Sequence, residues 1–237
     1  MILYNLLDFG AYLYFWGSLL GLFVSAIIYW KKPDLRKEMV ISGIGVALVG
    51  IISEKIFFQD YWNPPLIYRF GTFGGIEDLM FGFAAGSVGA VLFNVIFLKK
   101  SVRNRKPKII ILPIVIISEY LCVQILTNLI QINSIYSSAI GFLIPAVVIV
   151  SMRRELLLDT ILSAFACGMI LILSEGILLV ILGQNYLENF YLLHGKAPIL
   201  FGVFPITEFI WGFSFGAIIG PLYEFATGRS IASKIKR

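Results

Sequence analysis

The chain has 237 residues, of which 59% are hydrophobic and only 14% are charged, and its formal net charge is +5. Soluble domains carry about a quarter charged residues, so the composition excludes an ordinary soluble enzyme and indicates an integral membrane protein. The first residues carry no basic segment, so we expect no cleaved signal peptide.

Apolar segments long enough to cross a bilayer recur along the chain. In chain order we predict seven transmembrane helices, at residues 4–30, 39–59, 73–98, 109–130, 136–152, 160–182 and 199–226. The fifth is the shortest and contains Pro145. No soluble block of comparable size remains, so the predicted fold is all-α.

Basic residues gather in alternate connections between the predicted spans. KKPDLRKE, KKSVRNRKPK, RRE and the tail GRSIASKIKR hold 16 of the 19 Lys and Arg residues. The positive-inside rule therefore places the N-terminus outside and the C-terminus in the cytoplasm. These basic segments are explained by topology and contact with anionic lipid, so they do not indicate nucleic-acid binding.

The third and seventh predicted spans resemble each other. Residues 71–90 align with residues 201–220, with identities at Ile76/Ile206, Gly82/Gly212, Phe83/Phe213 and Gly86/Gly216, and with Asp78 on Glu208. Each half also has a Ser-Glu pair late in the preceding span, at Glu54 and Glu175. This pattern predicts an internal duplication.

The duplication predicts parallel repeats of three-helix units. The first repeat would span 1–100 and the second 136–237 including the basic tail, with a basic cytoplasmic loop and a connecting span at 101–135. The glycines spaced four apart in both segments permit close helix packing, and we expect them to pack the two repeats against each other.

Five acidic residues fall in the predicted spans at similar depth: Glu54, Glu77, Asp78, Glu175 and Glu208. A carboxylate in a membrane is costly unless it is paired or neutral, so these residues are candidates for catalysis. Carboxylates sharing one site of low dielectric constant cannot all be ionised, which provides an acid beside a base. The alternative is that first-turn acids only cap the helix N-termini.

The remaining polar residues carry weaker signals. Lys55 and Arg69 are the basic partners nearest the acids, and an ion pair of Lys55 with Glu54 is one alternative. Catalytic and structural interpretations of Glu119 stay open, Asp8 and Glu224 are expected at the membrane interface, and Asp159 and Glu188 in solvent. Cys122 and Cys167 lack metal-binding spacing and are expected in the core. With His194 as the single histidine, we predict no metal site.

Aromatic residues flank the acids in both predicted repeats: Trp62, Phe73, Phe81, Phe83, Trp211 and Phe213. Singly, each one is explained by helix packing or by an aromatic belt at the membrane interface. Together they would surround an acid with π faces, which stabilise a carbocation. They are therefore candidates for substrate binding.

The stretch YWNPPLIYRFGTFGGIEDLMFGF resembles the lycopene cyclase domain of membrane-bound carotenoid cyclases. The mark of that family is a loop with Trp and Pro, then Pro-x-Glu-Glu/Asp and a Phe-rich helix. The resemblance implies two fused domains that cyclise the ends of lycopene into ionone rings without net redox change. It implies catalytic roles for Glu77, Asp78 and Glu208.

The chain departs from the family pattern in both copies. Gly75 stands where the family has Pro, and Thr207 stands where the second copy should have its first acid. The resemblance therefore leaves open whether the copies are equivalent, and it does not name the substrate, the ring type or the residue that donates the proton.

The sequence thus predicts a multi-pass enzyme of the cell membrane that cyclises an isoprenoid, lycopene first of all. No cofactor is expected, because no glycine-rich nucleotide motif follows a strand. The expected partners are a lipophilic substrate, membrane lipid and other enzymes of carotenoid synthesis. The alternatives are a cyclase of another isoprenoid, a proton-coupled transporter or a non-catalytic pigment-binding protein.

Overall fold

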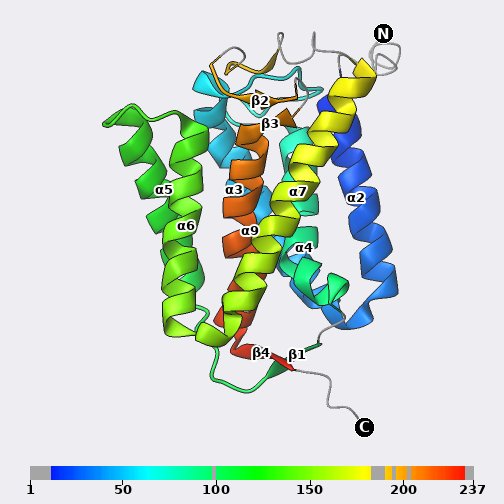
Figure 1. Ribbon diagram of the computed structural model, residues 1–237, viewed down its shortest axis with the longest axis vertical. Coiled ribbons are helices and arrows are strands. Elements are labelled where there is room, and N and C mark those ends of the chain that lie inside the picture. The colour runs from blue at the N-terminus through cyan, green and yellow to red at the C-terminus, as the bar shows by residue number, and fades with distance from the viewer. Residues whose placement is uncertain (1–11, 98–99, 183–189, 194–195, 202–203, 233–237) are drawn as a thin grey trace. The chain divides into compact units, whose positions relative to one another are not determined.

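The computed structural model describes residues 12–97, 100–182, 190–193, 196–201 and 204–232. In these residues, seven helices are long and apolar enough to cross a membrane (Figure 1). This confirms the predicted helical membrane class and indicates a multi-pass protein. The first predicted span begins at residue 4, so its start lies outside the described residues.

The helices follow one another with short connections. Their bounds are α2 (Leu13–Lys31), η1 (Pro33–Leu35), α3 (Arg36–Asp60), α4 (Ile76–Ile96), α5 (Ile111–Asn128), α6 (Ser134–Met152), η2 (Arg154–Leu156), α7 (Leu157–Leu182) and α9 (Ile206–Thr227), where η denotes a 3₁₀ helix. Predicted spans 2 to 6 match these helices to within three residues at each end. The Asn133 side chain accepts a hydrogen bond from Ile135 N and so fixes the start of α6.

The predicted start of the last span at residue 199 is wrong. Residues Ile199–Leu200 (β2) and Phe204–Pro205 (β3) pair as antiparallel strands, and α9 begins directly afterwards at Ile206. The hydropathy of these residues suits either a strand or a helix, so hydropathy alone could not place the boundary.

The chain divides into two compact units. The first comprises residues 1–88 and 174–205, and the second comprises residues 89–173 and 206–237. Their boundaries fall inside α4 and α7, so they differ from the repeats predicted from the sequence.

In the first unit, α4 packs on α3 through glycines. A methyl group on Gly82 would lie 2.8 Å from Ala47 Cα, and one on Gly86 would lie 2.6 Å from Ser42 O. Only a residue without a side chain permits this approach of the two backbones.

In the second unit, α9 packs on α7 in the same way. A methyl group on Gly212 would lie 2.9 Å from Cys167 O, and one on Gly216 would lie 2.8 Å from Cys167 Cβ. The expectation that these glycines join the two predicted repeats is therefore wrong. Each pair packs helices that belong to the same predicted repeat.

The second unit also contains a strand pair that the sequence did not indicate. Lys100–Arg103 (β1) pairs antiparallel with Arg229–Ala232 (β4), with Arg103 opposite Arg229. Gly228, at a φ of +71°, permits the turn that leads from α9 into β4. Part of the predicted basic loop, residues 100–103, therefore pairs with part of the predicted basic tail, residues 229–232.

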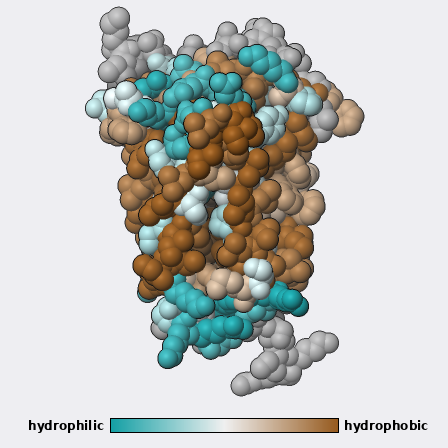
Figure 2. Space-filling view, turned by 90° about the vertical axis from the view of Figure 1, so that its left-hand side faces the viewer, coloured by the Kyte–Doolittle hydropathy of each residue, from teal (hydrophilic) through white to brown (hydrophobic). Residues whose placement is uncertain are grey.

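Apolar side chains remain exposed along the helices. On the face shown in Figure 2, hydrophobic residues cover the middle and hydrophilic residues gather at both ends. Ile117 and Leu121 on α5 and Val147 on α6 are 57%, 51% and 66% exposed. Such side chains are suited to contact with lipid rather than water.

Candidate functional site

Three of the predicted acids lie together in the first unit. Glu54 is in α3, and Glu77 and Asp78 are in the first turn of α4. All three are buried, with 9%, 0% and 2% exposure. Residues 61–75 connect the two helices, and we call Glu54, Glu77 and Asp78 the acid cluster.

Asp78 accepts hydrogen bonds at both carboxyl oxygens. The Tyr14 hydroxyl donates to Oδ1 over 2.6 Å, and the backbone N–H of Gly75 donates to Oδ2 over 2.5 Å. The second bond caps the N-terminus of α4. The alternative that first-turn acids cap helix N-termini is therefore correct for Oδ2 of Asp78. This bond requires a residue other than proline at position 75, because proline has no N–H to donate.

Glu77 is held differently. Its Oε1 accepts a 2.6 Å hydrogen bond from the backbone N–H of Ile67, in the connecting segment. Its Oε2 is buried and has no hydrogen-bond partner among the described residues. A buried unpartnered oxygen costs about 1–3 kcal/mol, which makes Glu77 Oε2 the candidate atom for chemistry in the acid cluster.

Glu54 approaches Asp78 at Gly74. A methyl group on Gly74 would lie 2.6 Å from Asp78 Oδ2 and 3.0 Å from Glu54 Cγ. Glu54 Oε2 accepts a 3.1 Å hydrogen bond from Trp62 Nε1. The alternative ion pair with Lys55 is wrong, because Lys55 is exposed and forms no ion pair among the described residues.

The connecting segment folds back over the start of α4. Phe70 N donates to Gly74 O and Ile76 N donates to Tyr68 O, around a turn in which Gly71 has a φ of +63°. The segment is also tied to a distant part of the same unit, since Asn63 N donates to Phe190 O. The backbone N–H groups that bind Glu77 and Asp78 are thereby fixed in place.

Tyr14 is a site residue that sequence reasoning missed. Its ring lies 4.4 Å from the Trp62 ring, edge to face, and 6.0 Å from the Phe81 ring. The predicted aromatic residues Trp62 and Phe81 therefore do lie beside the acid cluster. Phe73 is 43% exposed. A tyrosine in an apolar helix carries no sequence signal that separates it from the aromatic belt.

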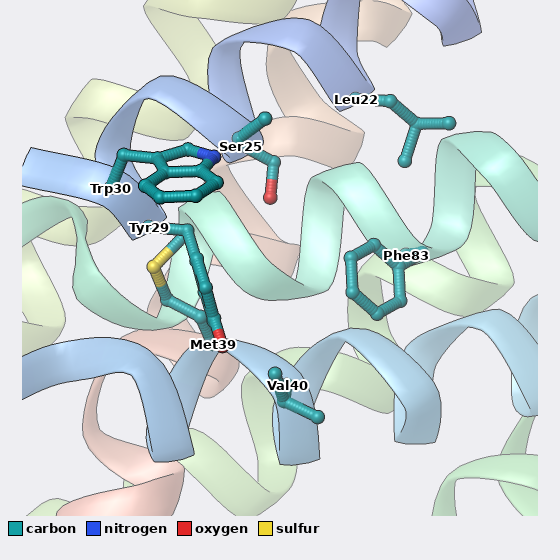
Figure 3. Close-up of a pocket in the computed structure, with 8 residues that line it drawn as sticks. Leu22, Ser25, Tyr29, Trp30, Met39, Val40 and Phe83 are labelled. Carbon is teal, nitrogen blue, oxygen red and sulfur yellow. The ribbon is translucent and has the colours of Figure 1, made fainter. Parts of the chain in front are cut away.

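Phe83 lies farther along α4 and lines a pocket of about 310 Å³ between α2, α3 and α4. Figure 3 shows the residues that line this pocket with Phe83: Leu22, Ser25, Tyr29 and Trp30 of α2, and Met39 and Val40 of α3. The lining is mainly apolar. Phe83 follows Asp78 by five residues, which corresponds to about 7.5 Å along a helix.

The remaining predicted site residues lie in α7 and α9. Glu175, in α7 of the first unit, is half-buried, and so is Glu208, in the first turn of α9 in the second unit. Trp211 stacks on Phe215 at 5.1 Å, and Phe213 lies edge to face with Phe165 at 5.1 Å. The predicted single layer of five acids stays a prediction.

Several other acids differ from their expected surroundings. Asp159 was expected in solvent but is 1% exposed, so that expectation is wrong. Glu224, expected at the membrane interface, is 0% exposed in the last turn of α9, and its depth in the membrane stays a prediction. Glu119 is half-buried, with its Cγ 3.3 Å from where a methyl group on Gly141 would lie. Asp8, Glu188 and His194 lie outside the described residues.

Both cysteines are free; Cys167 is buried, as expected, whereas Cys122 is only half-buried.

Comparison of the chain with protein-family models, with curated proteins and with solved structures finds no match. The acid cluster is therefore interpreted from its own geometry.

Proposed function

We propose that this protein is a membrane-embedded isoprenoid cyclase and that lycopene is the first substrate to test. The observation that carries the proposal is the acid cluster, in which three buried carboxylates lie beside the rings of Tyr14 and Trp62. Acid-initiated cyclisation of an alkene requires a proton donor, a proton acceptor and an environment that stabilises a cation.

We assign the proton donor to Glu77. Both oxygens of Asp78 accept hydrogen bonds, from Tyr14 and from Gly75, whereas Glu77 Oε2 has no partner among the described residues. In the protonated form, Glu77 can transfer its proton to the terminal trisubstituted alkene of the substrate. The C–H bond forms as the O–H bond breaks, and a tertiary carbocation results.

The cation then closes the ring. The neighbouring double bond attacks the cationic carbon, which forms a six-membered ring and moves the positive charge into it. Loss of a ring proton to a carboxylate restores the alkene, so the reaction is an isomerisation without net redox change. Glu54 is the candidate acceptor because it lies in the acid cluster. The rings of Trp62, Tyr14 and Phe81 supply π faces for the cation.

The apolar pocket supports an elongated hydrocarbon substrate. It begins at Phe83, about one and a half helix turns along α4 from Asp78. An isoprenoid chain whose end group lies at the acid cluster could extend along α4 into this pocket. Substrate would enter directly from the lipid, because the pocket is bordered by helices expected to face the membrane.

We also propose that the chain is an internal duplication. α2 and α6 are both 19 residues long, and α6 begins 121 residues after α2. The offset is also 121 residues from the start of η1 to that of η2 and from the start of α3 to that of α7. It is 130 residues from the start of α4 to that of α9. The insertion of nine residues falls in the α7–α9 connection. With these offsets, Gly82 corresponds to Gly212 and Ala47 corresponds to Gly168. Both pairs are points of close approach between two helices, which supports a common origin.

In the duplication, Glu208 is the counterpart of Asp78 and Glu175 the counterpart of Glu54, while Trp211 and Phe213 are the counterparts of Phe81 and Phe83. Thr207 is the counterpart of Glu77, so the second copy lacks the carboxyl group to which we assign proton donation. We therefore propose that the first copy carries most of the activity. The positive-inside pattern supports an external N-terminus in the cell membrane.

Expression in a host that accumulates lycopene tests the proposal, with the pigments separated by chromatography. Cyclic products are expected from the unaltered protein, and their loss is expected from Glu77→Gln while the protein remains in the membrane fraction. Unchanged lycopene with the unaltered protein rejects lycopene as substrate. Ring formation that survives in both Glu77→Gln and Glu208→Gln rejects the mechanism.

A further inference from the structure

A second buried polar cluster lies in the second unit and has no role in the proposed reaction. Asp159 and Ser163 belong to α7, Glu224 to α9 and Asn94 to the end of α4. Their exposed fractions are 1%, 0%, 0% and 3%. The Ser163 hydroxyl donates to Asp159 Oδ1 over 2.9 Å, and Asn94 Nδ2 donates to Glu224 Oε1 over 3.3 Å.

Gly220 brings α9 against the α7 side of this cluster. A methyl group on Gly220 would lie 2.5 Å from Ser163 Oγ and 3.2 Å from Asp159 Oδ1. Glu224 follows Gly220 by four residues, so it lies on the same face of α9 one turn later. The Asp159–Ser163 pair and the Asn94–Glu224 pair therefore lie along one face of α9, where it meets α7 and α4.

The electrostatic field at this cluster of four polar side chains favours a positive charge. Glu224 and Asn94 lie in the last turns of α9 and α4, where the helix dipoles place partial negative charge. Among the described residues, Asp159 forms no ion pair with a basic side chain. Burial of an uncompensated carboxylate is costly, so Asp159 requires either a bound proton or a counter-charge.

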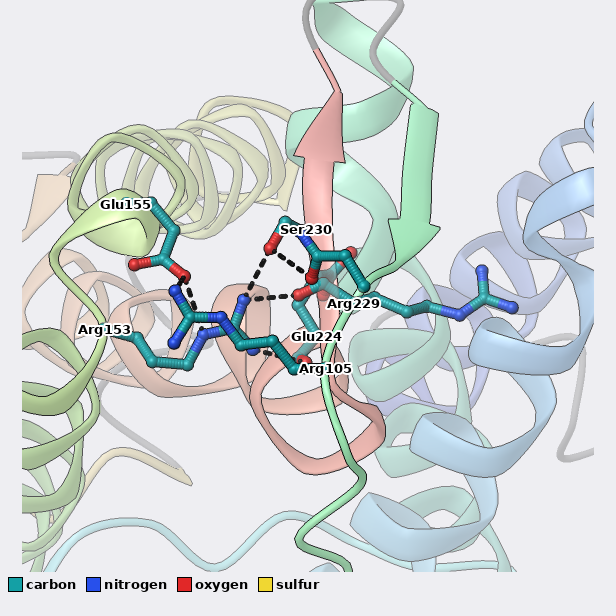
Figure 4. Close-up of polar contacts among 7 residues, drawn as sticks. Arg105, Arg153, Glu155, Glu224, Arg229 and Ser230 are labelled. Carbon is teal, nitrogen blue, oxygen red and sulfur yellow. Dashed lines mark hydrogen bonds and ion pairs between the residues drawn. The ribbon is translucent and has the colours of Figure 1, made fainter.

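Arg153 binds the backbone of Glu224, next to the cluster, and its guanidinium is occupied by several contacts. Arg153 donates to the backbone oxygens of Glu224 and Arg229, to Ser230 Oγ and to Glu155 Oε1 (Figure 4). Arg105 pairs with the same Glu155 oxygen over 2.9 Å. The guanidinium of Arg229 lies over the Tyr223 ring, 5.8 Å from its centre. These contacts hold the ends of α9 and β4 in place.

Asn94 provides independent evidence for a ligand. Its Oδ1 is buried and has no hydrogen-bond partner among the described residues, although its Nδ2 binds Glu224. The amide is thus directed at the cluster while its acceptor atom is unused. Amide, carboxylate and hydroxyl oxygens together form a donor set for a hard cation.

We infer that Asp159, Ser163, Glu224 and Asn94 bind a sodium ion. The site offers four oxygen-bearing side chains, all of them buried. Calcium requires six to eight oxygen ligands, and magnesium usually keeps several waters, so both fit a site of four buried side chains less well. The bound ion would join α4, α7 and α9, and so would stabilise the second unit.

Thermal unfolding of the full chain in detergent tests the inference. Sodium chloride should raise the unfolding temperature in a saturable way, relative to choline chloride at equal ionic strength. The shift should be lost in Asp159→Asn and kept in Asp34→Asn, which makes the same charge change at an exposed position. Ser163→Ala removes one donor without changing charge and should weaken the sodium response.

Two results overturn the inference. In the first, sodium and choline give the same unfolding temperature while lower pH stabilises the protein, which assigns the counter-charge to a proton. In the second, calcium or magnesium stabilises the protein and sodium does not. Equilibrium dialysis of the unaltered protein against radioactive sodium decides the question if the Asp159 variant does not fold. Saturable binding supports the site, and its absence rejects it.

Discussion

The Tyr14 hydroxyl donates a 2.6 Å hydrogen bond to Asp78 Oδ1 and so joins α2 to the first turn of α4. The two residues are 64 positions apart in the chain. The same tyrosine ring contacts Trp62, which in turn donates to Glu54. Tyr14 therefore connects two of the three carboxylates of the acid cluster to a neighbouring helix.

Tyr14→Phe removes this hydroxyl and keeps the ring. We expect a loss of about 1–3 kcal/mol in the free energy of unfolding, because a buried hydrogen bond to a carboxyl group is broken. Ring formation should also fall, since Asp78 loses a positioning contact. Denaturant unfolding and pigment chromatography measure the two effects. Tyr120→Phe, at a position in α5 that is 46% exposed, should leave ring formation unchanged. Equal losses from both variants would contradict a special role for Tyr14.

Glu77→Gln replaces the proposed proton donor by an amide of nearly equal size. A general acid contributes about 10²–10⁴-fold to rate, so ring formation should fall by at least about 10²-fold. Asp34→Asn makes the same charge change at an exposed position in η1 and should retain full activity. Initial rates with membrane fractions, normalised to protein amount, provide the comparison. Equal rates for the two variants would remove Glu77 from the mechanism.

Gly74→Ala tests the close approach of Glu54 and Asp78. The added methyl group would lie 2.6 Å from Asp78 Oδ2 and 3.0 Å from Glu54 Cγ, so at least one carboxyl group must move. We expect greatly reduced ring formation with the protein still in the membrane. Gly45→Ala is the matched control, because nothing lies within 4 Å of its added methyl group. Retained activity in Gly74→Ala would show that the spacing of the carboxyl groups is not critical.

Gly216→Ala tests the packing of α9 on α7. The new methyl group would lie 2.8 Å from Cys167 Cβ and 2.9 Å from Ala164 Cα. Overpacking of this kind costs about 1–3 kcal/mol. The unfolding temperature in detergent should fall, and Gly86→Ala should produce a similar fall in the counterpart pair α3 and α4. Stability close to that of Gly45→Ala would mean that these helices can separate without cost.

The proposed orientation can be tested with single cysteines in a chain that carries Cys122→Ala and Cys167→Ala. Tyr68→Cys, in the α3–α4 connection, should react with a membrane-impermeant maleimide on intact cells, because Tyr68 is 59% exposed. Lys106→Cys, in the basic α4–α5 connection, should react only after the cells are broken. The reverse pattern would place the N-terminus in the cytoplasm.

Hydropathy determined the number of long apolar helices, because each membrane-spanning helix must be apolar over about 20 residues whatever its neighbours are. It located α3 to α7 to within three residues. It failed at residues 199–200 and 204–205, where strand pairing replaces the expected start of a helix. Residue preference in such a short apolar segment does not separate a strand from a helix.

The acids themselves were evident from the sequence, because Glu77 and Asp78 are charged residues in an apolar segment. Their different environments were not evident. Gly75 N and Tyr14 reach Asp78, and Ile67 N reaches Glu77, only because the α3–α4 connection folds back and α2 lies alongside. Burial of Asp159 and Glu224 was missed for the same reason.

The sequence by itself determined the class of the protein, the number of its long apolar helices and the presence of acids within them, since these depend on each segment and the lipid around it. Tertiary structure alone decided which carboxylates lie close together, which carboxyl oxygen lacks a hydrogen-bond partner and at which glycines two helices pack closely. Those features depend on contacts between residues far apart in the chain, and such contacts cannot be predicted from the hydropathy of each segment.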